Sequence, residues 1–303
     1  MFYNIGSGIL RAVGDSTRPL YFLIFSALLN LGLDLLFVCV FRMGIEGAAW
    51  ATIIAQAISA VLTFVVLGRE KGSYRVELRA LSIKKNVLGQ VIRIGLPMAV
   101  QTGIISLSNV FVQAYINAFQ SACMAGWASY NKLDAFIWLP MLSLGMAVTT
   151  FVGQNLGAEE FDRAKKGARF GILCSLLIAE GIGVITYVFS PVFIGAFCDS
   201  QAAIAFGVDK AHICALFFCL LAATHCLSAV LRGAGRAMVP MVVMLSVWCV
   251  LRVSILWIAV PITQSINTVN WVYPITWSIS TVVLLIYYRK SDWLHSFQRE
   301  KAE

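Results

Sequence analysis

Three polar residues stand at four-residue intervals in an apolar segment near the start of the chain. They are Ser26, Asn30 and Asp34, and on a helix this spacing places them on one face. Thr52 lies in the next apolar segment, at a depth similar to that of Asp34 if the two segments form an antiparallel hairpin. Carboxylate, amide and hydroxyl oxygens suit a hard cation such as Na⁺, and a desolvated carboxyl group can carry a proton instead. Asn30, Asp34 and Thr52 are therefore predicted to form a Na⁺ or H⁺ site. The alternative is a set of hydrogen bonds between two helices, which accounts for a carboxylate poorly.

Other ionisable residues also lie inside apolar segments, where a charge is costly and hence a candidate for function. Glu180 and Arg252 are expected at equal depth, which would allow a buried ion pair. A proton relay at Glu180 and binding of a substrate cation are the alternatives. His225 is expected to be a hydrogen-bonded residue between helices rather than a pH switch.

A second polar face lies in the segment 94–117. Its members are candidates for lining a substrate cavity, or else they join neighbouring helices: Gln101, Asn109, Gln113 and Asn117.

The elements that must position these residues are membrane helices. Hydrophobic residues make up 59% of the chain and charged residues 13%, about half the charge of a typical soluble domain. Eight apolar segments are each long enough to cross a bilayer: 20–41, 46–68, 94–117, 136–156, 169–190, 209–230, 238–260 and 268–288. Residues 1–10 are expected to be the end of a ninth. The predicted fold is an all-α integral membrane protein with eight transmembrane helices.

Basic residues are distributed unevenly among the connections. Of the 23 Lys and Arg, nineteen lie in alternate loops and only Arg42, Lys132 and Lys210 in the other loops. The positive-inside rule places the first set of loops and both termini in the cytoplasm, with the chain in the plasma (inner) membrane. Charges dispersed over such loops do not predict nucleic-acid binding. The lipid bilayer is the expected partner, and no feature of the chain requires a protein partner.

An internal repeat gives the organisation. The pattern Leu-Arg-x-x-Gly-x-x-x-x-Pro occurs at 10–19 and again at 231–240, and the same offset relates Trp50 to Trp271. Such repeats are typical of transporters. Four more apolar segments precede the second copy than the first, so we expect an N-terminally incomplete chain. The expected parts are a first-lobe remnant at 1–68, a cytoplasmic linker at 69–93, a six-helix second lobe at 94–288, and a cytoplasmic tail at 289–303.

Signatures of enzymes are missing from the sequence. It holds no H-E-x-x-H, G-x-S-x-G or Walker motif, and its eight cysteines include no C-x-x-C pair. The chain is therefore expected to be neither an enzyme nor the holder of a cofactor. Without a nucleotide-binding loop, any transport would be driven by a gradient of Na⁺ or H⁺.

Several motifs resemble the multidrug and toxic compound extrusion (MATE) family. They are the segment 10–19, the run G-A-A-W-A-T at 47–52, I-G-L-P at 94–97, and G-Q-N-L-G-A at 153–158. The resemblance covers nearly the whole chain. It implies a two-lobed protein of twelve helices, of which this chain would supply helices five to twelve, and an exchange of Na⁺ or H⁺ for small organic cations.

The resemblance also assigns a cation site. An asparagine and an aspartate on helix five and a threonine on helix six form it, and Asn30, Asp34 and Thr52 occupy these positions. Its further aspartate belongs on helix one, which this sequence does not include, so the site is expected to be incomplete. Some relatives carry acidic residues on helices seven and ten. Here Gln113 stands on helix seven and no acid on helix ten, which puts coupling through the second lobe in doubt.

The leading interpretation is a cation-coupled antiporter that exports organic cations or drugs across the plasma membrane. One alternative is a flippase for a lipid-linked precursor, which would need a basic cavity, and Arg252 is the only candidate for that. A non-transporting remnant is the other alternative.

Overall fold

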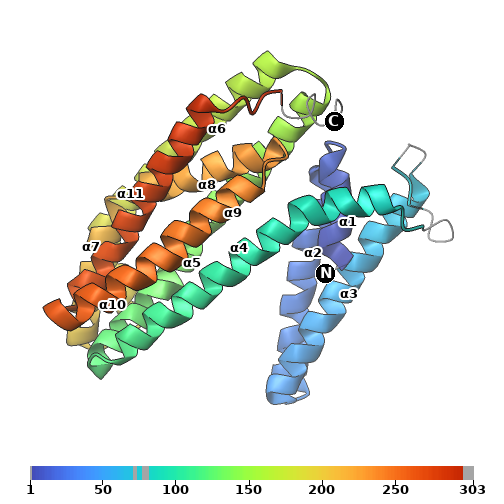
Figure 1. Cartoon of the computed structure of the whole chain (residues 1–303). Coiled ribbons are helices and arrows are strands. Elements are labelled where there is room, and N and C mark those ends of the chain that lie inside the picture. The colour runs from blue at the N-terminus through green and yellow to red at the C-terminus, as the bar shows by residue number, and fades with distance from the viewer. Residues whose placement is uncertain (1, 71–73, 77–81, 296–303) are drawn as a thin grey trace. The chain divides into compact units, whose positions relative to one another are not determined.

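The computed structural model describes residues 2–70, 74–76 and 82–295, which form helices joined by short turns (Figure 1). The chain divides into two compact units, Met1–Lys84 (unit 1) and Lys85–Glu303 (unit 2). Within the described residues, seven helices are long and apolar enough to cross a bilayer, and the bent pair α7–α8 can supply an eighth span. The predicted all-α membrane fold with eight spans is confirmed.

The helices follow one another with few intervening residues. Unit 1 contains α1 (Phe2–Ala12), α2 (Thr17–Asp34), the π-helical segment η1 (Leu35–Val40) and α3 (Gly44–Arg69). Unit 2 contains α4 (Lys85–Asn117), α5 (Ser121–Gly157), α6 (Phe161–Gly195), α7 (Gln201–Ala215), α8 (Phe218–Gly233), α9 (Met238–Met244), the π-helical segment η3 (Leu245–Leu251), α10 (Arg252–Thr263) and α11 (Ile266–Lys290).

Several helices of unit 2 begin earlier than hydropathy predicts, and α4 and α5 do so by the largest number of residues. Helix α4 begins at Lys85 instead of residue 94, so residues 85–93 belong to a helix and not to the linker. Helix α5 begins at Ser121 instead of residue 136. Charged residues lower the hydropathy of both stretches, although lysine, alanine and leucine favour the helix. Other parts of the predicted linker and tail, at 71–73, 77–81 and 296–303, lie outside the described residues.

The internal repeat recurs in backbone geometry. Gly14 and Gly235 occupy equivalent positions in the two copies, and both follow a helix with a positive φ, of 92° and 77°. In each copy the carbonyl of the motif's leucine accepts from the amide that follows this glycine: Leu10 O from Asp15 N at 2.9 Å, and Leu231 O from Arg236 N at 2.9 Å. A left-handed residue is needed to end a helix in this way, and glycine adopts that conformation without strain.

Unit 1 is held together by close contacts of α1 and α2 with α3. Gly6 of α1 leaves no room for a side chain, because a Cβ there would lie 2.5 Å from Thr63 Cγ2. At the ends of the α2–α3 hairpin, Arg18 donates to the carboxylate of Glu70. This hydrogen bond lowers the pKa of Glu70 below its ordinary value.

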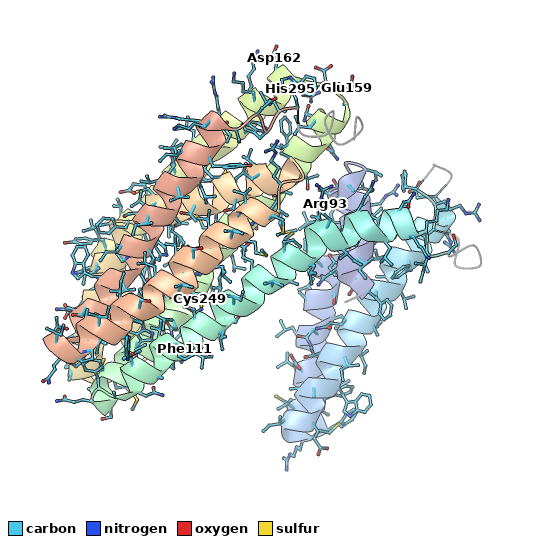
Figure 2. All side chains as sticks on the ribbon, viewed as in Figure 1. Arg93, Phe111, Glu159, Asp162, Cys249 and His295 are labelled. Carbon is cyan, nitrogen blue, oxygen red and sulfur yellow. The ribbon has the colours of Figure 1, made fainter. Side chains whose placement is uncertain are left out.

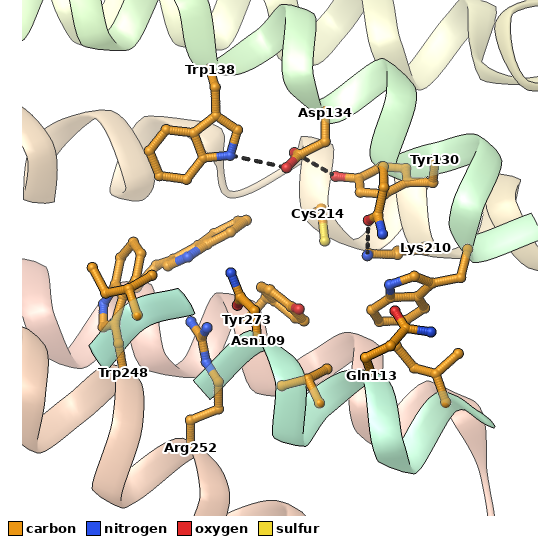
Figure 3. Close-up of a pocket in the computed structure, with 16 residues that line it drawn as sticks. Asn109, Gln113, Tyr130, Asp134, Trp138, Lys210, Cys214, Trp248, Arg252 and Tyr273 are labelled. Carbon is orange, nitrogen blue, oxygen red and sulfur yellow. Dashed lines mark hydrogen bonds between the residues drawn. The ribbon is translucent and has the colours of Figure 1, made fainter. Parts of the chain in front are cut away.

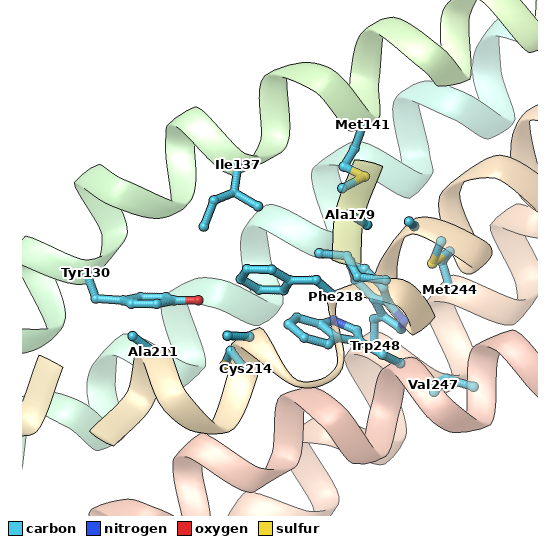
Figure 4. Packing of buried hydrophobic residues seen from close by; sticks show 14 of the residues in the cluster. Tyr130, Ile137, Met141, Ala179, Ala211, Cys214, Phe218, Met244, Val247 and Trp248 are labelled. Atoms are coloured by element: carbon cyan, nitrogen blue, oxygen red, sulfur yellow. The ribbon is translucent and has the colours of Figure 1, made fainter. Parts of the chain in front are cut away.

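The core of unit 2 lies where α5, α7, α8 and α11 meet η3. Phe218, Trp248 and Trp277 are buried there and pack with Met141 and Ala179 (Figure 4). In a bilayer the lipid is as apolar as these side chains, so close packing rather than exclusion of water stabilises the bundle.

Small residues allow α5 and α7 to approach closely. A Cβ on Gly126 would lie 2.2 Å from Ala203 O, and one on Gly207 would lie 2.9 Å from Gly126 O. Glycine and alanine at four-residue spacing are the usual means by which membrane helices come into backbone contact. The contact lies beside the site described below, because Trp127 and Lys210 follow these glycines within one turn.

Charged side chains gather at the end of unit 2 where α5 gives way to α6. Figure 2 shows Glu159, Asp162 and His295 there, whereas Phe111 and Cys249 lie along the sides of the helices. His295 packs on Phe161, with ring centroids 4.9 Å apart. The apolar sides and charged end are the distribution that a bilayer requires.

Candidate functional site

The first candidate site is the polar stripe of α2 in unit 1. Ser26 is buried, and its hydroxyl donates to Ala55 O of α3 at 2.9 Å. Ser26 therefore joins the two helices, as the hydrogen-bond alternative predicts for a stripe of this kind. Its hydroxyl hydrogen is used in that contact.

Asn30 and Thr52 are brought together as predicted. Asn30 Nδ2 lies 3.4 Å from Thr52 Oγ1, and Thr52 Oγ1 in turn donates to Ala48 O at 2.9 Å. One amide hydrogen of Asn30 and the hydroxyl hydrogen of Thr52 are used between protein groups. The acceptor oxygen of Asn30 and a lone pair of Thr52 therefore remain for a ligand.

Asp34 differs from its neighbours because its Oδ1 is buried without a hydrogen-bond partner. A buried carboxylate oxygen without a donor is costly, and a bound cation or proton removes that cost. Asp34 is also the last residue before η1, where the hydrogen-bond pattern widens and Phe41 N bonds to Leu36 O at 3.0 Å. Such π-helical turns are frequent at functional sites.

The second candidate site is a cavity of about 240 Å³ within unit 2 (Figure 3). Helices α4, α5, α7, α10 and α11 and the segment η3 line it. Six aromatic residues face it: Trp127, Tyr130, Trp138, Trp248, Tyr273 and Trp277. An acidic side chain and two basic side chains share the cavity: Asp134, Lys210 and Arg252.

The predicted polar face of α4 reaches this cavity only in part. Asn109 and Gln113 line it, whereas Gln101 and Asn117 do not. Gln113 Nε2 donates to Asn117 Oδ1 at 2.8 Å. Gln101 is buried elsewhere, and its Oε1 has no hydrogen-bond partner.

Lys210 corrects the sequence interpretation, which assigned it to a loop. It lies in α7 with 3% of its surface exposed. Its Nζ stands 3.1 Å from the centroid of the Trp127 ring, 4.3 Å from that of Tyr130 and 5.1 Å from that of Tyr273. Aromatic faces attract an ammonium group, so these rings form a cage for the charge. Its hydrogen-bond acceptor is Asn131 Oδ1 at 3.4 Å.

Asp134 was not predicted as a site residue, because hydropathy begins the span after it. It lies in α5, where Trp138 Nε1 donates to its Oδ2 at 2.9 Å and Tyr130 Oη to its Oδ1 at 3.4 Å. Its carboxylate is thereby supplied with donors from its own helix, at i±4. No ion pair joins Asp134 to Lys210 within the part of the chain that the structure describes.

The expected ion pair between Glu180 and Arg252 does not form. Arg252 is 1% exposed, donates from Nη2 to Thr276 Oγ1 at 2.9 Å, and stacks its guanidinium on Trp248 and Tyr273. Glu180 is exposed and lines a separate pocket. Equal depth in the bundle does not place two residues on facing sides of their helices.

We expected His225 to be hydrogen-bonded between helices, but its Nε2 makes no hydrogen bond. That nitrogen is buried without a partner. The ring instead meets Trp138 and Trp248 edge-on, with centroids 4.7 Å and 5.6 Å away. Aromatic packing thus holds the residue between helices.

Known proteins resemble this chain in sequence and in fold. A sequence model of the MatE family matches residues 97–258, more than half of the chain. The chain belongs to the MATE family. Two relatives are probable multidrug resistance proteins of Bacillus subtilis. YoeA is 29% identical over 289 residues, which cover 92% of this chain and 62% of YoeA. YpnP is 30% identical over 251 residues, which cover 82% of this chain and 56% of YpnP.

Solved MATE structures share the fold. A crystal structure of MATE in the bent conformation superposes with a TM-score of 0.88 at 21% identity, covering 100% of this chain and 67% of the other. Membership in this family makes the chain a multi-pass membrane protein of a transporter family and not an enzyme. The chain is shorter than its relatives and spans about three-fifths of the length of the two Bacillus proteins.

Proposed function

We propose that this MATE-family chain belongs to a cation-coupled antiporter, which exchanges Na⁺ or H⁺ for organic cations or other drug-like compounds. The observation that carries the proposal is Asp34, whose buried Oδ1 lacks a partner beside the Asn30–Thr52 pair. A carboxylate in that state gains most from a cation or proton. The multidrug names of the Bacillus relatives support the class of exported compound.

The three residues divide the work of ion binding. Asp34 supplies the negative charge, and it alone can release a proton. Asn30 and Thr52 add neutral oxygens, and their mutual contact holds both in place on facing helices. Coupling follows because an ion and a cationic compound both need a negative charge, and one carboxylate cannot satisfy both at once.

We expect gradient-dependent efflux of ethidium, a fluorescent organic cation, from cells that express the longest natural polypeptide in which this sequence occurs. Efflux should stop when the Na⁺ gradient or the H⁺ gradient is collapsed by a selective ionophore, and the effective ionophore identifies the coupling ion. Cells carrying an empty vector are the control. Efflux that survives the collapse of both gradients would contradict the proposal.

The protein is proposed to reside in the plasma membrane with both termini in the cytoplasm. Basic residues support this orientation, because nineteen of the 23 Lys and Arg lie in or beside one alternate set of connections. Fluorescent-protein fusions at the two termini should fluoresce, and alkaline phosphatase fusions at the same positions should be inactive. An active phosphatase at either terminus would reverse the assignment.

A further inference from the structure

Two buried cations face one cavity in unit 2. Lys210 Nζ lies 5.1 Å from the centroid of the Tyr273 ring, and Arg252 Cζ lies 4.6 Å from the same centroid. The two charged groups therefore share one aromatic neighbour, and Figure 3 shows Tyr273 between them. A single small ligand that lies along this ring can reach both.

Neither cation has a negatively charged partner among the described protein groups. Arg252 Nε is buried without a hydrogen-bond partner, and the guanidinium donates through Nη2 to the neutral hydroxyl of Thr276. Lys210 has one long hydrogen bond, to the neutral side chain of Asn131. No carboxylate lies within ion-pair distance of either residue in the described chain. Buried donors of this kind are stabilised strongly by an acceptor that carries charge.

The charge balance indicates a monoanion. Asp134 is the one acidic residue among those that line the described cavity, and its oxygens already accept from Trp138 and Tyr130. With Lys210 and Arg252 charged, the two basic groups exceed the acidic group by one positive charge. One negative charge on a ligand would neutralise the cavity.

The walls indicate an aromatic body for that ligand. Aromatic side chains from α5, η3 and α11 face the cavity, and flat rings pack well against such walls. The cavity measures about 240 Å³, whereas a cavity of about 150 Å³ is known to hold benzene. The cavity therefore has room for a benzene ring, and the additional volume has room for one small charged substituent.

We propose that this cavity binds a small aromatic carboxylate, with its carboxylate between Lys210 and Arg252 and its ring against the aromatic walls. Asn109 and Gln113, which also line the cavity, add neutral hydrogen-bonding groups from α4. The proposal rests on residues of unit 2 and not on Asp34, so it does not depend on the proposed export of cations.

Equilibrium dialysis with radiolabelled benzoate tests the proposal on the full chain in detergent. Micelles without protein give the background. Benzylamine and benzyl alcohol have the same ring with a positive and a neutral substituent. Benzoate should bind at least about tenfold more tightly than either, because only its charge matches the two cations. Equal binding of benzoate and benzylamine would overturn the proposal.

Variants locate the bound carboxylate. Lys210→Met and Arg252→Met should each weaken benzoate binding by about tenfold or more. Lys132→Met is the matched control, since Lys132 also lies in a helix but contacts Phe197 instead of the cavity. Size-exclusion profiles and circular dichroism confirm that each variant is folded. If one of the two cavity variants fails to fold, the benzoate affinity of the other variant tests the site. Wild-type affinity in a folded cavity variant would overturn the site.

Competition separates an aromatic carboxylate from an inorganic anion. Unlabelled benzoate should displace the label at concentrations at which chloride and inorganic phosphate do not. Displacement by chloride or phosphate at the same concentrations as by benzoate would overturn the assignment of an aromatic ligand. These measurements require no transport, so a failure of ethidium efflux leaves their outcome unaffected.

Discussion

Replacing Asp34 by asparagine should abolish gradient-driven efflux while leaving the protein folded. Asparagine keeps the size of the side chain but loses the charge that attracts Na⁺ and the group that releases a proton. A charged hydrogen-bonding partner contributes about 1.5–3 kcal/mol, which corresponds to roughly 10- to 150-fold in ion affinity. Ethidium efflux should therefore fall to the rate seen without a gradient.

Neighbouring residues supply graded controls for Asp34. Asn30→Ala and Thr52→Ala should reduce the coupled rate less, because each removes one neutral oxygen ligand among several. Ser26→Ala is the matched control on the same stripe, since its hydroxyl donates to Ala55 O and belongs to the contact between the helices. Coupled efflux by folded Asp34→Asn at the wild-type rate would remove the cation site from α2.

Replacing Gly126 by alanine should destabilise unit 2 and loosen the cage around Lys210. The added Cβ would lie 2.2 Å from Ala203 O and 3.0 Å from Gly207 N. Both are backbone atoms, so α7 as a whole must move away. Overpacking of this kind costs about 1–3 kcal/mol. A lower melting temperature, measured by size-exclusion chromatography of heated samples, is the expected result.

Gly181 is the matched control for that experiment. It also lies in a long helix, α6, but a Cβ there would meet nothing within 4 Å. Gly181→Ala should therefore be neutral or stabilise the protein by up to about 1 kcal/mol, the helix propensity difference. If Gly126→Ala melts at the temperature of Gly181→Ala, the close approach of α5 and α7 is not a constraint on the fold.

The sequence was sufficient to predict the helices and their repetition. Long apolar segments have few alternatives to a membrane helix, because every backbone polar group must be satisfied within the segment. The offset that relates Gly14 to Gly235 was visible as a motif, and the positive φ at both positions shows that the motif encodes a helix end.

The second-unit cavity could not be predicted in the same way. Asp134 lowers the hydropathy of its own segment, so an analysis by hydropathy begins the span after it, and Lys210 stands at the edge of the predicted span 209–230. The aromatic cage also depends on helices far apart in sequence, since Trp127 belongs to α5 and Tyr273 to α11. A useful signal was present over 127–138, where Lys132 and Asp134 stand between aromatic residues.

The prediction of an ion pair between Glu180 and Arg252 was wrong for a different reason. Counting residues from a membrane surface estimates the depth of a side chain, because the helical rise per residue is constant, but not the direction in which that side chain points. Ala179 is fully buried, whereas Glu180, the next residue, is exposed. One residue turns a helix by about 100°, which is enough to change a buried position into an exposed one.

Helix α2 and the α9–η3–α10 segment are copies of one another in sequence register, yet they carry charges of opposite sign. The position equivalent to Asp34 is Ile255, and the position equivalent to Arg252 is Leu31. The duplicated backbone therefore does not dictate the sign of a buried charge. The surroundings of the two charges differ as well, because Thr52 contacts Asn30 of the acidic stripe in one copy and Tyr273, at the equivalent position, contacts Arg252 in the other. In evolutionary terms, duplication gave two scaffolds whose ligand chemistry was free to diverge without rebuilding either helix. A protein engineer can use the same freedom and transplant side chains between equivalent positions to reverse a site's preference.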